Sequence, residues 1–127
     1  HQALATMGAE KWLSMSAAAL PYGHQRLVEV ARAIAMRPHY LFLDEPAAGL
    51  NEHESAELLG RLAPLPKSQN LGMLIVDHDM HLIMRLCHRL HVLNYGRTIA
   101  QGTPQEVRRI PEVIEAYLGS SAETVHA

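Results

Sequence analysis

The chain has 127 residues, 48% of them hydrophobic, which is enough to bury the core of one domain and too little for two. Acidic residues outnumber basic ones by 13 to 11, so the composition gives no basic surface of the kind that binds nucleic acid. A single cysteine, Cys87, excludes an internal disulfide and suits a reducing compartment, and no apolar run approaches the roughly 20 residues of a membrane-spanning helix.

The chain opens on His1 without an initiator Met or a signal-peptide pattern, so we expect a fragment of a longer protein. Residues 1–20 include many small and apolar residues and are expected to end a helical region that began upstream. Pro21-Tyr22-Gly23 predicts a break, and apolar residues then recur at helical spacing over residues 25–37. The run Tyr40-Leu41-Phe42-Leu43 is typical of a short buried strand.

The next stretch pairs Asn51 with Glu54 in the pattern of a capping box, which predicts a helix to about Leu62. Pro64 and Pro66 indicate a loop before a second buried strand at residues 71–76. A helix follows that strand. The residues that we expect on its buried face are Met80, Ile83, Met84 and Cys87.

The last part of the chain predicts a hairpin of residues 90–93 and 97–100 around the turn Asn94-Tyr95-Gly96. Thr103-Pro104-Gln105-Glu106 combines an N-cap, a proline and a capping Glu, so a short helix begins there. Residues 111–118 predict a final helix, and the tail after Gly119 is expected to fray. Because strands alternate with helices, the fold class is α/β with parallel pairing, although so few strands make a thin sheet.

Two acidic residues follow the first predicted strand. A carboxylate at the end of a strand lies at the carboxyl edge of the sheet, where open α/β folds bind ligands. Asp44 can hold Mg²⁺ there, because that cation prefers oxygen ligands, and Glu45 can polarise an attacking water. The alternative interpretation is an acidic pair that merely starts a turn, and the pair alone does not separate the two.

Three neighbouring segments favour the first interpretation. Leu20-Pro21-Tyr22-Gly23-His24 opens a helix whose free N–H groups and positive dipole end suit a phosphate. Ala47-Ala48-Gly49-Leu50-Asn51 follows Glu45, and His78 follows the second strand at the same sheet edge as Asp44. In this order the segments resemble the signature, Walker B strand, D-loop and H-loop of the second half of an ABC transporter nucleotide-binding domain.

The resemblance covers nearly the whole chain and implies the C-terminal part of a P-loop NTPase-type fold, with parallel strands, flanking helices and a C-terminal hairpin. Residues 1–38 would end the helical subdomain and carry the signature. Residues 39–119 would be the catalytic-core portion, with Walker B, D-loop and H-loop, and residues 120–127 a flexible tail.

The resemblance also implies a role for each site residue. Asp44 would be the magnesium ligand, Glu45 the general base for ATP hydrolysis, and His78 the contact to the γ-phosphate. Such domains dimerise head to tail around two ATP molecules. The signature residues on the ATP of the opposite subunit would be Leu20, Pro21, Tyr22, Gly23 and His24. The D-loop residues along the dimer interface would be Ala48, Gly49, Leu50 and Asn51.

Four positions depart from the commonest family pattern. Pro21 supplies neither a hydroxyl nor a backbone N–H, whereas Gly23 still permits close backbone approach. Tyr at the third signature place, and sometimes Pro at the second, occurs in the branched-chain amino acid importers, as does Asn51 at the end of the D-loop. His24 stands where Gln is usual, and we hypothesise a pH-sensitive contact there.

A Gly-rich phosphate loop ending in Lys-Ser or Lys-Thr is missing. The two lysines, Lys11 and Lys67, lie outside any such loop. In the family this loop precedes the signature, so truncation at the N-terminus is the simplest account. By this reasoning the full-length protein is an ABC-type ATPase, and the isolated chain is expected to be inactive.

The resemblance is closest to the larger ATP-binding subunit of branched-chain amino acid importers. It rests on residues 45–51, on Asp77-His78-Asp79-Met80 and on the ending from Gly102 to Gly119. It implies a second ATP-binding subunit and transmembrane permease subunits as partners, no nucleic acid, and a peripheral place on the cytoplasmic face of the inner membrane. The substrate is chosen by those partners and cannot be read from this chain.

Alternatives stay open at this point. Urea or amide importers and lipopolysaccharide exporters share much of the pattern. A soluble ABC ATPase of DNA repair or translation, or a non-catalytic truncated remnant, are the other candidates. A metal site would have to use residues whose spacing fits no standard zinc pattern. Those residues are His78, His81, Cys87, His88 and His91.

Overall fold

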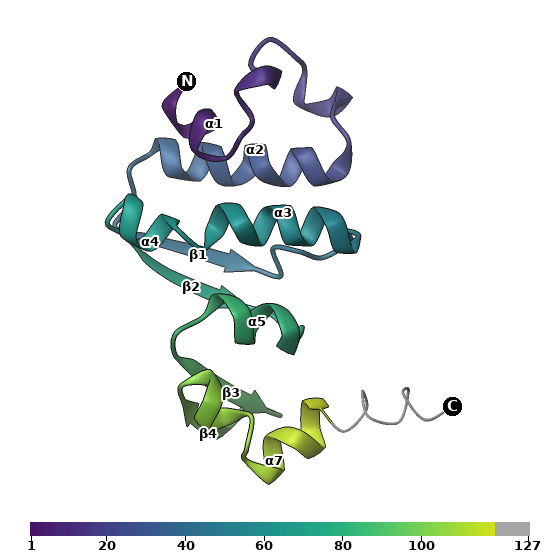
Figure 1. The fold of residues 1–127 in the computed structure, drawn as a ribbon, viewed down its shortest axis with the longest axis vertical. Coiled ribbons are helices and arrows are strands. Elements are labelled where there is room, and N and C mark those ends of the chain that lie inside the picture. Colours follow the sequence, from purple (N-terminus) through teal and green to yellow (C-terminus); the bar gives the residue numbers. More distant parts are fainter. Residues whose placement is uncertain (119–127) are drawn as a thin grey trace. The chain divides into compact units, whose positions relative to one another are not determined.

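The computed structural model describes residues 1–118 as two compact units, of which the first is His1–Val76 and the second begins at Asp77 (Figure 1). Within this part of the chain no helix is long and apolar enough to cross a membrane. The predicted tail after Gly119 lies outside the described residues.

The first unit places helices beside a short parallel sheet (Figure 1). The longest helix, α2, exposes one face and buries Leu27, Val30, Ala31 and Ile34 on the other. The elements in chain order are α1 (Gln2–Thr6), η1 (Glu10–Trp12), η2 (Ala17–Ala19), α2 (Tyr22–Ala35), β1 (Tyr40–Asp44), α3 (Glu52–Leu62), α4 (Leu65–Ser68) and β2 (Gly72–Val76).

Strands β1 and β2 pair in parallel, with Tyr40 opposite Gly72 and Asp44 opposite Val76, so both strands end at the same edge. Leu41 on the helix side is buried. The opposite side, which we call the open sheet face, exposes large apolar side chains. The open sheet face consists of Tyr40, Phe42, Leu74 and Val76.

Three predictions for the first unit need correction. The two strands are not buried as predicted, because only Leu41 of β1 and no residue of β2 is buried. Helix α2 begins at Tyr22 rather than Gln25, because Pro21 with its extended ψ of 150° acts as the N-cap instead of as part of a break. The loop predicted around Pro64 and Pro66 contains the one-turn helix α4, since proline is tolerated in a first helical turn. The capping box of Asn51 and Glu54 is confirmed, and α3 ends at Leu62 as predicted.

The second unit consists of α5 (Met80–Leu86), an antiparallel hairpin of β3 (Leu90–Asn94) and β4 (Arg97–Gly102), and short C-terminal helices. Tyr95 and Gly96 form the two-residue turn, both with positive φ, as a type I′ turn demands. The helices are α6 (Pro104–Val107) and α7 (Pro111–Val113), followed by the π-helical turn η3 (Ile114–Leu118).

The hairpin and the capped start of α6 are confirmed, but the buried face of α5 differs from the prediction. Leu82, Ile83 and Leu86 are buried there, whereas Met80 and Met84 are only half-buried. Cys87 lies just beyond the helix as its C-cap. The predicted final helix is divided into α7 and η3, and it is anchored by a hydrogen bond that the Tyr117 hydroxyl donates to the carbonyl of Leu93.

Candidate functional site

Asp44 and Glu45 lie where β1 leaves the sheet, and both side chains are exposed. The backbone N–H of Glu45 donates to the carbonyl of Val76 at 2.7 Å, which fixes Glu45 beside the last residue of β2. Glu45 has a φ of +44°, a region that non-glycine residues seldom occupy. Such strain is typical of functional positions, because only a demanding local geometry maintains it.

The D-loop residues follow as a tight turn. The N–H of Ala48 donates to the carbonyl of Glu45 at 3.0 Å, and the N–H of Leu50 donates to that of Ala47 at 3.1 Å. Gly49 has a φ of +78°, which favours glycine. Asn51 then caps α3, because its side chain accepts a hydrogen bond from the N–H of Glu54 at 2.8 Å. The turn therefore ends on a rigid helix start.

The signature spans the start of α2. Leu20 is buried and its carbonyl accepts a hydrogen bond from the Gln25 side chain at 2.8 Å, while Pro21 is exposed. Tyr22 and Gly23 lie in the first turn of the helix, Tyr22 exposed and Gly23 buried. No side chain among residues 1–118 caps this helix start, and uncapped backbone N–H groups are what a phosphate contact requires.

His24, the unusual signature residue, packs against a side chain of its own unit. Its ring stacks on Trp12, with ring centroids 4.1 Å apart and an interplanar angle of 26°. The Nδ1 atom of His24 is enclosed and has no hydrogen-bond partner among residues 1–118. Lys11 lies over the Trp12 ring at 4.8 Å. Sequence reasoning missed Trp12, since nothing in the local pattern links it to the signature.

Tyr22, the next aromatic residue of the signature, contacts Arg26. Its hydroxyl accepts a hydrogen bond from Arg26 at 2.6 Å, and the guanidinium of Arg26 lies 5.1 Å from the ring centroid. Arg26 also forms an ion pair with Glu29 at 3.0 Å. Burial alone would lower the pKa of Arg26, but Glu29 and Tyr22 together raise it above its usual value. Arg26 is thus a permanent cation beside the signature.

His78 lies in the second unit, two residues after the end of β2. Its side chain is 79% exposed, and its Nδ1 is 3.9 Å from the carboxylate of Asp77. Asp77 accepts a hydrogen bond from the N–H of Asp79 at 2.9 Å. Asp79 in turn caps α5, accepting from the N–H groups of His81 and Leu82. The segment after β2 is therefore a hydrogen-bonded turn that carries His78.

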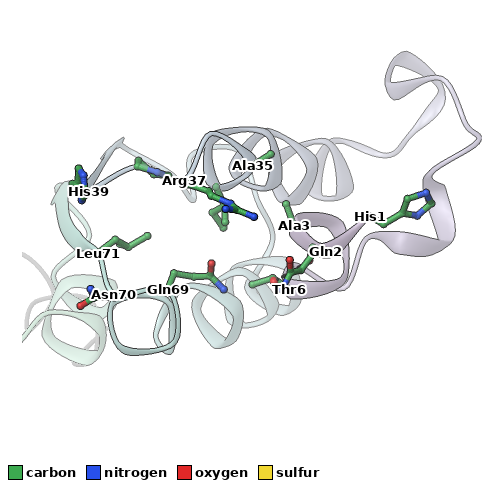
Figure 2. A pocket seen from close by; sticks show the side chains of 12 residues that line it. His1, Gln2, Ala3, Thr6, Ala35, Arg37, His39, Gln69, Asn70 and Leu71 are labelled. Atoms are coloured by element: carbon green, nitrogen blue, oxygen red, sulfur yellow. Dashed lines mark hydrogen bonds between the residues drawn. The ribbon is translucent and has the colours of Figure 1, made fainter.

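A cavity of about 530 Å³ lies at the amino ends of β1 and β2, whereas Asp44 lies at their carboxyl ends. Polar side chains from three segments line it. Those shown in Figure 2 include Gln2, Thr6, Arg37, His39, Gln69 and Asn70. None of the predicted site residues lines this cavity. Among residues 1–118, no group of three or more His, Cys, Asp or Glu side chains is arranged to hold a metal ion.

Solved structures match this fold. The chain superposes with a TM-score of 0.82 and 26% identity on the ADP conformation of an ATP-binding cassette of an ABC transporter, covering 93% of this chain and 48% of that one. It superposes with a TM-score of 0.81 and 29% identity on cbiO1 from Clostridium perfringens, part of an ABC transporter complex, covering 99% of this chain and 51% of that one.

Sequence comparisons give a more specific similarity than the solved structures do. The family model described as branched-chain amino acid ATP-binding cassette transporter matches residues 97–123. The chain is 43% identical over 118 residues to LivG of Salmonella typhimurium, named a high-affinity branched-chain amino acid transport ATP-binding protein, covering 93% of this chain and 46% of the relative. BraF of Pseudomonas aeruginosa, which has the same description, is 43% identical over 111 residues, covering 87% and 44%.

By sequence, this chain is similar to ATP-binding proteins of branched-chain amino acid transport, and by fold it is similar to ATP-binding cassettes of ABC transporters. The resemblance inferred from the four ordered segments is confirmed, and so is the fold class of a C-terminal cassette part. The chain spans about half the length of the curated relatives and of the solved cassettes. The roles of individual residues in this half-cassette remain predictions.

Proposed function

We propose that this chain is the C-terminal half of an ATP-hydrolysing subunit that energises the import of branched-chain amino acids. The observation that carries the proposal is the shared end of β1 and β2. Asp44 and Glu45 leave the sheet there, Glu45 is hydrogen-bonded to Val76, and the chain continues from Val76 to His78. The names of the relatives LivG and BraF support the substrate class.

The residues at this edge fit magnesium and nucleotide. Mg²⁺ is held in phosphate sites by one or two carboxylates together with phosphates and water, and the exposed carboxylate of Asp44 at a strand end suits that role. Bound Mg²⁺ would neutralise phosphate charge. Glu45 would accept the proton of the attacking water, and its constrained backbone would hold the carboxylate in place. His78 would help to position that water.

The remaining parts of the site would come from outside these 127 residues. The Gly-rich phosphate loop would lie in the N-terminal half of the cassette. The ATP bound there would be completed by the signature of a second ATP-binding subunit in a head-to-tail dimer. The partners that choose the substrate would be permease subunits, and the cassette would then lie on the cytoplasmic face of the membrane. The chain alone is not expected to hydrolyse ATP.

Lipopolysaccharide export is the second candidate function. LptB of Haemophilus influenzae, a lipopolysaccharide export system ATP-binding protein, is 37% identical over 101 residues, covering 80% of this chain and 42% of the relative. The identity is lower than with LivG, and the matched family model is that of the amino acid transporters. Uptake of labelled leucine by vesicles containing the complete transporter would separate the two. Leucine uptake that depends on ATP is expected, and its absence would favour export.

The test of catalysis is Glu45→Gln in the full-length subunit assembled with its permease. The amide keeps the shape of the side chain but cannot act as a base, so turnover should fall by at least about a hundredfold while ATP stays bound. Glu52→Gln, an equally exposed acid in the first turn of α3, is the matched control and should hydrolyse ATP normally. Near-normal hydrolysis by Glu45→Gln would refute Glu45 as the base.

A further inference from the structure

Gly23 of the signature is buried within its own unit, and the place of its missing side chain is already filled. A Cβ atom at Gly23 would lie 2.8 Å from Cδ and 2.9 Å from Oε1 of Glu54. Both distances are shorter than van der Waals contact, so any side chain at this position would displace the carboxylate. Packing within the chain therefore favours glycine at this position, independently of any ligand.

Glu54 is held in that place by the D-loop. Its carboxylate Oε2 accepts a hydrogen bond from the backbone N–H of Asn51 at 3.0 Å, while its own N–H donates to the Asn51 side chain at 2.8 Å. These two bonds close the capping box of α3. One carboxylate thus contacts the signature helix on one side and the last residue of the D-loop on the other.

A second contact joins the same two segments. A Cβ atom at Gly49 would lie 3.0 Å from the Tyr22 ring, and the φ of Gly49 is +78°. The Tyr22 ring is itself held by Arg26 through the hydrogen bond to its hydroxyl. Each segment thus has a glycine whose missing side chain leaves room for a residue of the other: Glu54, which caps the helix after the D-loop, lies against Gly23, and Tyr22 of the signature lies against Gly49. The signature and the D-loop interlock.

We propose that Glu54 is a positioning residue that locks the signature helix to the D-loop, so that the two segments expected to face the partner subunit move as one body. The inference rests on the proposed function, because that function identifies these segments as the signature and the D-loop. The contact between Glu54 and Gly23 does not depend on it. In the alternative account, Gly23 is required only because a nucleotide phosphate approaches its backbone. The two accounts predict different behaviour when Glu54 is shortened.

The experiment is a double-mutant cycle of Gly23→Ala and Glu54→Ala in the full-length cassette assembled with its permease. Gly23→Ala should lower kcat/KM for ATP by about tenfold, because the methyl group displaces Glu54 and disturbs both segments. In the Glu54→Ala background the same substitution should cost less than about twofold. Glu54→Gln has the size of Glu54 and still accepts from Asn51, so it should retain activity and should not suppress Gly23→Ala.

A loss caused by Gly23→Ala that is equally large in the parental protein and in the Glu54→Ala background would overturn the proposal. Urea unfolding of the same variants without nucleotide separates this result from a failure of the proposed function. If the shifts in the urea midpoint caused by the two substitutions are not additive, the contact between Gly23 and Glu54 is supported, even in a protein that hydrolyses no ATP. If the shifts are additive, the contact is rejected, even in a protein that hydrolyses ATP.

Discussion

Four residues other than glycine within residues 1–118 have a positive φ, and only one of them is a candidate for catalysis. Arg37 and Asn70 follow helices, and Tyr95 lies in a hairpin turn, all places where a left-handed residue reverses the chain. Glu45 instead follows a strand directly. Its backbone leaves the extended conformation immediately after Asp44, so the chain turns away from the strand direction at the second of the two acids.

Cys87 gives a prediction at the same scale. Burial raises the pKa of its thiol, because the thiolate is poorly solvated there. Alkylation by iodoacetamide requires the thiolate, so labelling of the folded protein at about pH 8 should be slower than labelling in urea, and should accelerate as the pH rises. A raised pKa also means that this group stabilises the fold below its unfolded pKa and ceases to do so in the alkaline range. Equal labelling rates in folded and unfolded protein would contradict the burial.

At the scale of elements, the hairpin turn offers a substitution that should stabilise the protein. Tyr95 is fully exposed and has a φ of +47°, whereas asparagine is the residue preferred before glycine in a type I′ turn. Tyr95→Asn should raise the free energy of unfolding by about 0.5–1 kcal/mol, as measured by urea denaturation.

The matched control for that substitution is Tyr117→Asn. It changes the same residue type but removes the hydroxyl that donates to Leu93, so it should destabilise the protein. A loss of stability on Tyr95→Asn would show that the turn does not strain the tyrosine.

The elements that sequence reasoning predicted well are those with a local cause. Asn51 with Glu54, and Thr103 with Glu106, each close a capping box within four residues, and the hairpin turn is marked by Gly96. The start of α2 was missed because Pro21 is compatible with both a break and an N-cap. The burial of Gly23 against Glu54 could not be predicted, since it depends on tertiary packing between segments that are distant in sequence.

For the whole molecule, the open sheet face is the feature with the largest consequence. Phe42 is 72% exposed and Leu74 58%, in a parallel sheet, a type that is almost always covered on both sides. A contiguous apolar surface of this kind promotes association. The isolated chain should therefore form soluble oligomers, and Leu74→Lys should shift it towards monomer in sedimentation velocity.

Tyr95→Lys is the matched control for that prediction, because it places the same charge on an exposed aromatic residue that does not belong to the open sheet face. It should leave the oligomers unchanged. An equal effect of the two lysine substitutions would attribute the association to net charge rather than to the open sheet face.

The common register of β1 and β2 has a consequence for how the protein can change in length. Asp44 lies opposite Val76, and the N–H of Glu45 is hydrogen-bonded to the carbonyl of Val76. The two ends of the segment from Pro46 to Ile75 are therefore held close together. Extra residues at the exposed Gln69–Asn70 connection would lengthen this segment without moving either of its ends. Evolution can lengthen the loop there at little cost, and a reporter tag inserted at the same place would leave the carboxylates where they are.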